Sequence, residues 1–326
     1  MSIRIISRIG ACAAVAFCMA CSGSQQPPVS FTRGEDGFPM ITPPETIASE
    51  EARAEYLTIH FWDAYLGEIY EMGVDSLCMN GISRKALEDN FALWAVLLEP
   101  SSEEVVTKAV AQWFKGITSW PVCAVHPGIF NEMTALAGKY MYDPQSPVHN
   151  EVSYAVVAQT LSQYPGLDSL RRKIYANQAH LCSLNKEGTK AGDFTFITPD
   201  GSEKTLYSVK APLTLLVFSN PGCKMCEDIQ RVMAGSPDLA EMLEDGQLAI
   251  VNIYPDEDVA AWRKVVKDYP KTWISGIDKD QSIRNEQIYN LWAIPSLYLL
   301  GSDKTVILKD APLHVVLNKI AFMTSL

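Results

Sequence analysis

The feature that most constrains the fold is a pair of cysteines between a predicted buried strand and a predicted helix. Leu213–Phe218 is a continuous apolar run, which is typical of a strand covered on both faces of a sheet. A short loop leads to Cys223-Lys224-Met225-Cys226, and helix signals continue from Cys226 to Met233. Because α/β sheets place their active crevices at the carboxyl ends of such strands, this position favours a chemical role over a purely structural disulfide.

A cysteine in the first turn of a helix lies near unpaired backbone N–H groups and the positive end of the helix dipole, which stabilise its thiolate. A lowered thiol pKa makes Cys223 a candidate nucleophile near neutral pH. Lys224 beside it is a candidate for further tuning of that pKa. The spacing lets Cys226 attack the mixed disulfide formed by Cys223 and release it. We therefore expect Cys223 to be exposed and Cys226 to be buried.

Further strands and helices are predicted around the cysteine pair from apolar runs and apolar spacing. After a polar joint at 186–190, strands are predicted at 194–198, 206–209, 213–218, 248–254, 296–300 and 305–308, and helices at 226–233, 260–269 and 313–322. This order predicts an α/β domain over residues 183–326, with a central mixed sheet and helices on both faces.

Residues 46–182 are predicted to form a second, all-helical domain. Pro100 ends one predicted helix, and Ser101-Ser102-Glu103-Glu104 opens the next. Other helices are predicted from Ser49 to Tyr65 and at 84–99, 129–140, 151–162 and 168–180. Strand patterning is absent here, so the chain is predicted to be a two-domain α+β protein whose N-terminal domain is a bundle or a solenoid-like stack.

Residues 1–21 are predicted to be an export signal that ends in a lipidated cysteine. Arg4 and Arg8 form a basic region, and the apolar stretch Ile9–Ala20 is too short to span a bilayer. Ala20-Cys21 resembles a bacterial lipobox, with secretion and nearby cleavage as the alternative. Residues 22–45 are polar and Pro-rich, which predicts a flexible tether. We expect a protein of the bacterial cell envelope or periplasm, held at a membrane only by a lipid on Cys21.

Export changes how the remaining cysteines are interpreted, because disulfides persist outside the cytosol. The cysteines that remain are odd in number, so at least one thiol is free or pairs transiently; they are Cys78, Cys123, Cys182, Cys223 and Cys226. Cys78 and Cys123 are candidates for a disulfide within the helical domain. Cys182, at the domain joint, is either a buried small hydrophobe or, if exposed, a third redox thiol.

A second motif, Trp292-Ala293-Ile294-Pro295-Ser296, precedes a predicted strand. With the cysteine pair, it makes residues 188–326 resemble a thioredoxin-fold domain of the TlpA/ResA-like periplasmic type. The resemblance implies thiol–disulfide oxidoreductase activity, with protein thiols and disulfides as partners and a membrane electron donor. It also implies a cis Ile294-Pro295 bond beside the cysteine pair, which offers the Ile294 backbone to an extended substrate strand.

The chain departs from that family at the groups that handle protons. Thioredoxin has a buried aspartate where this chain has Val217, and the acidic residue of ResA-like proteins is matched by Ile229. The usual proton acceptor for the buried thiol is therefore missing, and Glu227 and Asp228 are expected to face outward. Lys224-Met225 stands where Gly-Pro is familiar, so the redox potential of the family cannot be transferred.

The whole chain also resembles a group of envelope lipoproteins that carry a domain of unknown function before the thioredoxin fold. The resemblance rests on residues 139–147, on Asn150-Glu151 and on Tyr154. It implies no activity for the helical domain, whose aromatic residues are expected to form its core.

Charge and histidine content argue against other functions. The net charge of -11 argues against nucleic acid, whose phosphates need a basic surface. Past the expected signal peptide there is no second Cys-x-x-Cys motif, and His314 is the sole histidine of the C-terminal domain, which argues against zinc. We expect an envelope thiol–disulfide oxidoreductase that acts as a reductase without cofactor or metal. Two alternatives stay open: a redox-inactive thioredoxin-fold binding module, and a protein that handles Cu(I) through the two thiolates.

Overall fold

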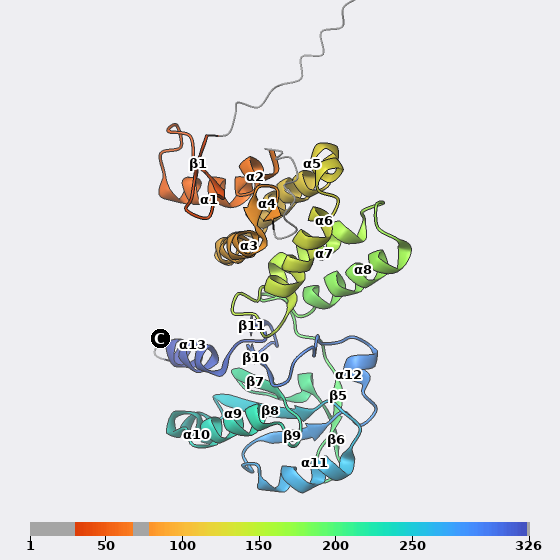
Figure 1. Ribbon diagram of the computed structural model, residues 1–326. Helices are drawn as coiled ribbons and strands as arrows, with labels where there is room; N and C mark the ends of the chain where they lie inside the picture. The colour runs from red at the N-terminus through yellow and green to blue at the C-terminus, as the bar shows by residue number, and fades with distance from the viewer. Residues whose placement is uncertain (1–29, 68–77, 325–326) are drawn as a thin grey trace, which may run out of the picture.

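The structure is a computed structural model that describes residues 30–67 and 78–324. The expected signal peptide and the expected lipidation site Cys21 lie outside the described residues. Figure 1 shows a helical part at the N-terminal side and a part built around a sheet at the C-terminal side. Within the described residues, no helix is both long and apolar enough to cross a membrane.

The helical part confirms the expectation of a domain made mainly of helices. Its helices are α1 Glu50–His60, α2 Asp63–Gly67, α3 Arg84–Leu98, α4 Glu103–Ile117, α5 Trp120–Val125, α6 Ile129–Ala137, α7 Glu151–Ser162 and α8 Ser169–Ser183, with a π-helical turn at Gly138–Tyr142. Polar N-caps fix several helix starts: Ser49, Ser83, Ser102, Asn150 and Asp168 each accept a backbone N–H. Large aromatic side chains fill the core, among them Trp62, Trp94 and Trp113.

The structure differs from the expected tether at residues 22–45. From residue 30 onward this segment is folded, because β1 Phe31–Arg33 and β2 Pro39–Ile41 form an antiparallel hairpin. Phe38 is 1% exposed, and its ring packs on Phe61, Trp62 and Tyr65. A few large apolar residues inside a polar, Pro-rich stretch are enough to anchor it, because each aromatic ring buries a large apolar area.

A second small hairpin departs from the prediction that residues 46–182 contain no strand. It consists of β3 Cys78–Met79 and β4 Ile82–Ser83. Asn80 and Gly81 form the turn with positive φ angles of 48° and 84°, which is the backbone that tight hairpin turns require. The strands are too short to give an alternating pattern in the sequence.

The C-terminal part contains a seven-stranded mixed sheet with the strand order β11-β10-β7-β8-β9-β5-β6. The strands are β5 Thr195–Ile197, β6 Glu203–Thr205, β7 Leu213–Phe218, β8 Leu248–Tyr254, β9 Ile274–Ile277, β10 Ser296–Leu300 and β11 Val306–Leu308. β7, β8 and β9 are parallel, whereas β10 and β5 are antiparallel to their neighbours β7 and β9. The interior strand β7 is buried along its whole length, as its continuous apolar run predicts.

Helices cover both faces of this sheet (Figure 1). They are α9 Lys224–Ala234, α10 Pro237–Glu244, α11 Val259–Val265, α12 Ser282–Asn285 and α13 Leu313–Thr324. Met233 of α9, Leu239 of α10 and Val316 of α13 pack on one face. Ile283 of α12 packs on the other face, in a core that also holds several aromatic rings.

Three elements of the sheet part differ from the sequence prediction. Residues 206–208 form a 3-10 turn rather than a strand, and the paired strand is Glu203–Thr205 just before them. β9 was not predicted, because Ile274-Ser275-Gly276-Ile277 has neither an apolar run nor strict alternation. The short helix α12 was also missed, since four residues give no helical period.

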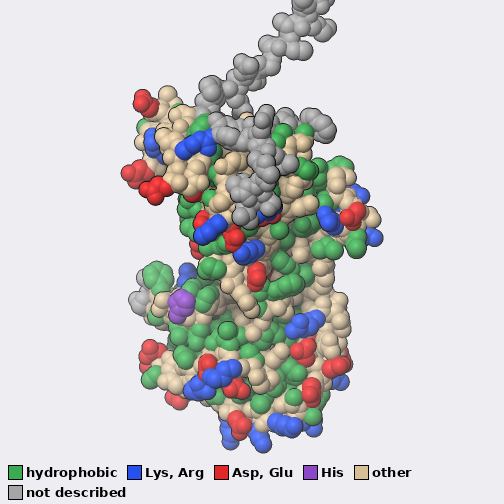
Figure 2. All heavy atoms as spheres, in the orientation of Figure 1, with side chains coloured by type: hydrophobic (Ala, Val, Ile, Leu, Met, Phe, Trp, Pro, Cys, Tyr) green, Lys and Arg blue, Asp and Glu red, His purple; other side chains and the backbone are tan. Residues whose placement is uncertain are grey.

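The two parts meet around a buried ion pair. Lys309 Nζ lies 2.7 Å from Glu151 Oε2 of α7, and both side chains are almost fully covered. The same ammonium donates to the carbonyl oxygens of Cys182 and Leu184 at the end of α8. Figure 2 shows hydrophobic side chains gathered where the two parts meet on this face of the molecule.

Candidate redox site

The loop after β7 and the start of α9 place Cys223. Gly222 has a φ of +76°, a left-handed conformation that costs glycine little and turns the chain toward the helix. Cys223 is the N-cap of α9, and its Sγ accepts the backbone N–H of Cys226 at 3.2 Å. Glu227 N donates to the Cys223 carbonyl at 3.0 Å, which closes the first turn. The sulfur of Cys223 therefore lies at the positive end of the helix, as the sequence predicts.

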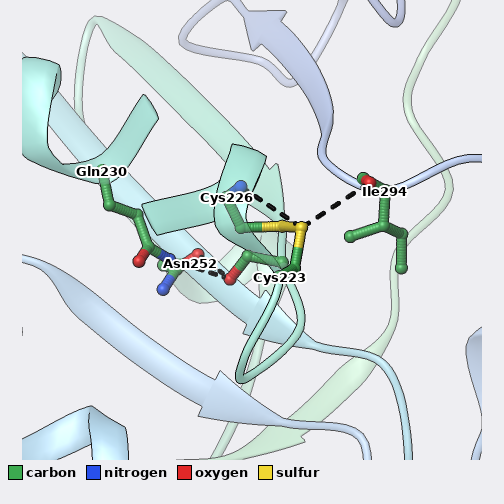
Figure 3. Close-up of a disulfide and its surroundings, with 6 residues drawn as sticks. Cys223, Cys226, Gln230, Asn252 and Ile294 are labelled. Atoms are coloured by element: carbon green, nitrogen blue, oxygen red, sulfur yellow. Dashed lines mark hydrogen bonds between the residues drawn. A yellow bond between two sulfur atoms is a disulfide. The ribbon is translucent and has the colours of Figure 1, made fainter. Parts of the chain in front are cut away.

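Cys223 and Cys226 form a disulfide with a Cα–Cα distance of 5.2 Å (Figure 3). Cys226 is only 1% exposed, whereas Cys223 is partly exposed. This difference confirms the expected order of exposure along the motif. A thiol that approaches from solvent reaches the Cys223 sulfur before it reaches the Cys226 sulfur, which lies beneath the helix.

The loop before β10 forms the opposite side of the site. The Ile294-Pro295 peptide bond is cis, as the family resemblance implies. The register of β10 on β7 pairs Ser296 with Phe218, so the residues before Ser296 lie next to the loop that follows Phe218. The carbonyl oxygen of Ile294 lies 3.9 Å from Cys223 Sγ and points toward it in Figure 3. Residues far apart in the sequence are thus brought together at one sulfur.

Lys224 is exposed and its ammonium is taken up by a carboxylate. Its Nζ pairs with Asp228 one turn further along α9, and Arg231 pairs with the same carboxylate. These two cations lower the pKa of Asp228. Because its charge is compensated and solvated, Lys224 contributes less to the Cys223 sulfur than an unpaired cation would.

Three polar residues near the start of α9 are joined by hydrogen bonds, and the sequence prediction missed them. They are Ser219, Gln230 and Asn252. Ser219 Oγ donates to Asn252 Oδ1 at 2.8 Å and accepts from Gln230 Nε2 at 3.0 Å. Ser219 and Asn252 are each 2% exposed. The one signal in the sequence was the asparagine within the otherwise apolar run 248–254, and it gave no partner.

The other cysteines of the described residues do not join this site. Cys182 is a free, buried thiol, and burial raises its pKa to about 12. Cys123 is also free, its Sγ donates to the Ile117 carbonyl, and partial burial raises its pKa. The suggested Cys78–Cys123 disulfide is therefore not formed, and the side chain of Cys78 lies outside the described residues. No group of three or more histidine, cysteine or acidic residues within the described ranges could hold a metal ion.

Comparison with known proteins assigns the N-terminal half. Residues 18–185 match the family model described as a domain of unknown function, DUF5106. The chain belongs to the DUF5106 family. No curated protein matches the chain.

Solved structures match the part that follows the DUF5106 domain as well as the domain itself. A thioredoxin-like protein from Bacteroides caccae is 29% identical, and the match covers 91% of this chain and 99% of that one with a TM-score of 0.75. The C-terminal domain of an uncharacterized protein from Bacteroides fragilis is 42% identical over 42% of this chain and 98% of that domain, with a TM-score of 0.41. Because the Bacteroides caccae structure covers both parts, the C-terminal part of this chain is a thioredoxin-like domain that follows a helical DUF5106 domain.

Proposed function

We propose that this protein is a thiol–disulfide oxidoreductase of the bacterial cell envelope that works as a reductase. The Cys223 thiolate attacks one sulfur of a substrate disulfide, and the other substrate sulfur leaves as a thiolate that takes up a proton. The Cys226 thiolate then attacks the Cys223 sulfur and expels the second substrate thiol. The substrate disulfide gains two electrons, and the protein is left with the Cys223–Cys226 disulfide. A dithiol or quinol-linked carrier in the membrane must return two electrons for each cycle.

One observation carries this proposal: the partly exposed sulfur at the start of α9 has a buried partner three residues away. The helix start supports the thiolate of Cys223, and burial of Cys226 keeps the resolving thiol away from substrates. We assign the lowering of the Cys223 pKa chiefly to the helix N-terminus. Lys224 has a minor tuning role, because its ammonium is paired with Asp228.

Groups around the sulfur favour a polypeptide as the substrate. The Ile294 carbonyl beside Cys223 can accept a backbone N–H from an extended chain, with Pro295 as the wall of the site. Met225 and Trp292 are 65% and 62% exposed, so two large apolar side chains flank the motif and the loop. Exposed apolar groups of this size are typical of surfaces that bind another chain.

Two cysteine variants test the proposal in the full chain. Replacing Cys223 with Ser should abolish the acceleration of insulin reduction by dithiothreitol, because the accessible nucleophile is lost and Cys226 is buried. Replacing Cys226 with Ser should trap substrates as mixed disulfides on Cys223, and their identity would define the pathway. Cys182→Ser is the matched control and should keep full activity.

The outcome that contradicts an enzymatic role is unchanged biological function in the Cys223→Ser strain. That result would favour the redox-inactive binding module. If the Cys223→Ser strain loses function only when Cu(I) is limiting, the result would instead favour the copper-handling alternative.

We also propose that a lipid on Cys21 holds the protein at a membrane of the envelope. The proposal rests on the basic and apolar residues before Cys21. Metabolic labelling with a fatty-acid analogue should mark the wild-type protein and leave Cys21→Ser unmarked. Equal labelling of both proteins would contradict it.

A further inference from the structure

We propose that Ser219, oriented by Asn252 and Gln230, is the polar group that supports the Cys226 sulfur when it gains or loses its proton. This inference rests on the proposed exchange reaction, in which Cys226 must ionise to attack Cys223. It assigns to three neutral side chains a role that carboxylates fill elsewhere in the resembling family, and it makes Ser219, Asn252 and Gln230 positioning residues for the resolving step.

The register of the sheet brings these side chains under the first turn of α9. On β7, Leu215 and Val217 face α9, so Ser219 two residues further along lies on the same face. On β8, Asn252 pairs with Val217 and follows Ile250 on that face. The two polar side chains therefore lie side by side at the carboxyl edge of an otherwise apolar surface.

Helix α9 contributes both the Gln230 amide and the Cys226 sulfur from the same face. Cys226, Gln230 and Met233 are spaced by four and three residues along α9, so they share the face that packs on the sheet. Gln230 reaches down to Ser219 from one turn beyond Cys226. Figure 3 shows Gln230 and Asn252 on the same side of the disulfide, away from Ile294.

Counting donors and acceptors shows what the hydroxyl can do for a sulfur. In the disulfide state, the Ser219 proton goes to Asn252 Oδ1, and one lone pair accepts from Gln230 Nε2. A hydroxyl has one donor and two acceptor positions, so one lone pair is left to accept a Cys226 S–H. Because a hydroxyl rotates about its C–O bond, it can also turn its proton to a thiolate. Gln230 Nε2 can hold the oxygen in both states, whereas Asn252 Oδ1 accepts the hydroxyl proton only until that proton turns to the thiolate.

Charged groups near the sulfur do not provide an alternative base under the helix. In the first turn of α9, Glu227 is exposed, and Asp228 is paired with Lys224 and Arg231 on the outer side. The residues of β7 and β8 that face α9 are apolar apart from Ser219 and Asn252, and the loop before β10 contributes Ile294 and Pro295. His314 of α13 is exposed. On the face of β7 and β8 toward α9, the polar side chains among the residues described are therefore the neutral Ser219 and Asn252.

The test is a titration of Cys226 in the reduced full-length protein. Selective labelling of cysteine Cβ with carbon-13 reports each thiol by NMR, and it needs no turnover. In Ser219→Ala, we expect the Cys226 pKa to rise by about one unit, because the thiolate loses its donor, and the release of a mixed disulfide at pH 7 to slow by about tenfold. The Cys223 pKa and the rate of its first attack should stay unchanged. Gln230→Leu should shift the Cys226 pKa in the same direction by a smaller amount.

Ser153→Ala is the matched control, since Ser153 is a fully buried serine in the DUF5106 domain. It should leave both thiol pKa values in place. The inference is overturned if the Cys226 pKa in Ser219→Ala and in Gln230→Leu equals that of the wild type. Near-UV circular dichroism must show that both variants are folded. A shifted Cys226 pKa in a protein whose Cys223→Ser variant is fully functional in cells would keep the inference about the sulfur and reject the proposed exchange reaction.

Discussion

Cys182, Cys223 and Cys226 have different surroundings, and they differ in how deeply their side chains are buried. Cys223 is partly exposed at a helix start, Cys226 lies beneath that helix, and Cys182 is sealed at the junction of the two domains. A thiol reacts as its thiolate, so the pKa and the access of a reagent together decide which cysteine is modified. The same residue type is therefore expected to be reactive at one site and inert at another.

Cys182 provides a direct test of this difference. Burial raises the pKa of Cys182 to about 12, so only a very small fraction of this thiol is ionised at pH 8, against about one in four for an ordinary free cysteine. We expect iodoacetamide at pH 8 to modify Cys223 in the reduced native protein and to leave Cys182 unmodified, as read by peptide mass spectrometry. Because the pKa of Cys182 is raised, labelling of this residue should increase only as the pH approaches 12. In guanidinium chloride, Cys182 should react like any other cysteine, and equal native labelling of both residues would contradict the expectation.

The residues that the sequence could identify are those whose role depends on local order along the chain. Cys223 and Cys226 were predicted from their spacing, and Ile294 and Pro295 from a motif in front of a strand. Ser219, Gln230 and Asn252 were not, because their hydrogen bonds depend on which strands are neighbours and in which register. That information resides in the pairing of β7 with β8 and not in any short segment.

At the scale of elements, long periodic or apolar segments were predicted well and short ones poorly. The prediction for 151–162 coincides with α7, and those for 213–218 and 248–254 coincide with β7 and β8. Each of these elements buries a continuous face, so its pattern survives in the sequence. β9 and the N-terminal hairpin are ordered by contacts with distant residues, and no local pattern announces them.

β9 depends on the absence of a side chain at Gly276. A Cβ there would lie 3.1 Å from Ile253 Cδ1 and closer still to the ring of Phe196, which is buried in β5. We expect Gly276→Ala to lower the free energy of unfolding by about 2 kcal/mol, because the tightly packed sheet cannot move away from the added methyl group. Urea denaturation followed by tryptophan fluorescence measures this loss.

Gly301→Ala is the control for Gly276→Ala, since it adds the same methyl group directly after β10 of the same sheet. The nearest atom to a Cβ at Gly301 is 3.6 Å away, which is ordinary contact. Its effect should stay within about 0.5 kcal/mol. Equal losses in both variants would show that the packing around β9 does not decide the outcome.

At the scale of the whole molecule, the DUF5106 domain and the thioredoxin-like domain share a polar junction next to the redox loop. Glu151 at the start of α7 accepts from Asn290 and pairs with Lys309, which follows β11. On the same side, Trp292 of the loop that carries Ile294 lies 5.1 Å from the ring of Tyr142. The domain of unknown function thereby contacts the segment that faces Cys223. The sequence could not predict this, because nothing local indicates which residues of the two domains meet.

The ion pair between Glu151 and Lys309 should couple the stabilities of the two domains. Its side chains are 13% and 12% exposed, so neither charge is well solvated if its partner is removed. A double-mutant cycle of Glu151→Gln and Lys309→Met should give a coupling energy of about 2 kcal/mol in urea denaturation of the full chain. Lys309→Met should also speed cleavage by trypsin in the joint at 184–190, because the carbonyl oxygens of Cys182 and Leu184 at the end of α8 lose their donor.

Lys186 and Glu103 provide the matched comparison, since they also link the joint to the DUF5106 domain. Their charged atoms lie 3.5 Å apart, and the side chains are 38% and 68% exposed. Water and salt screen such a pair, so the cycle of Glu103→Gln and Lys186→Met should give less than about 0.5 kcal/mol. If the two cycles give the same coupling energy, burial at the junction is not what joins the domains. If only the Glu151–Lys309 cycle is large, the helical domain holds the redox loop through charges that are largely shielded from solvent.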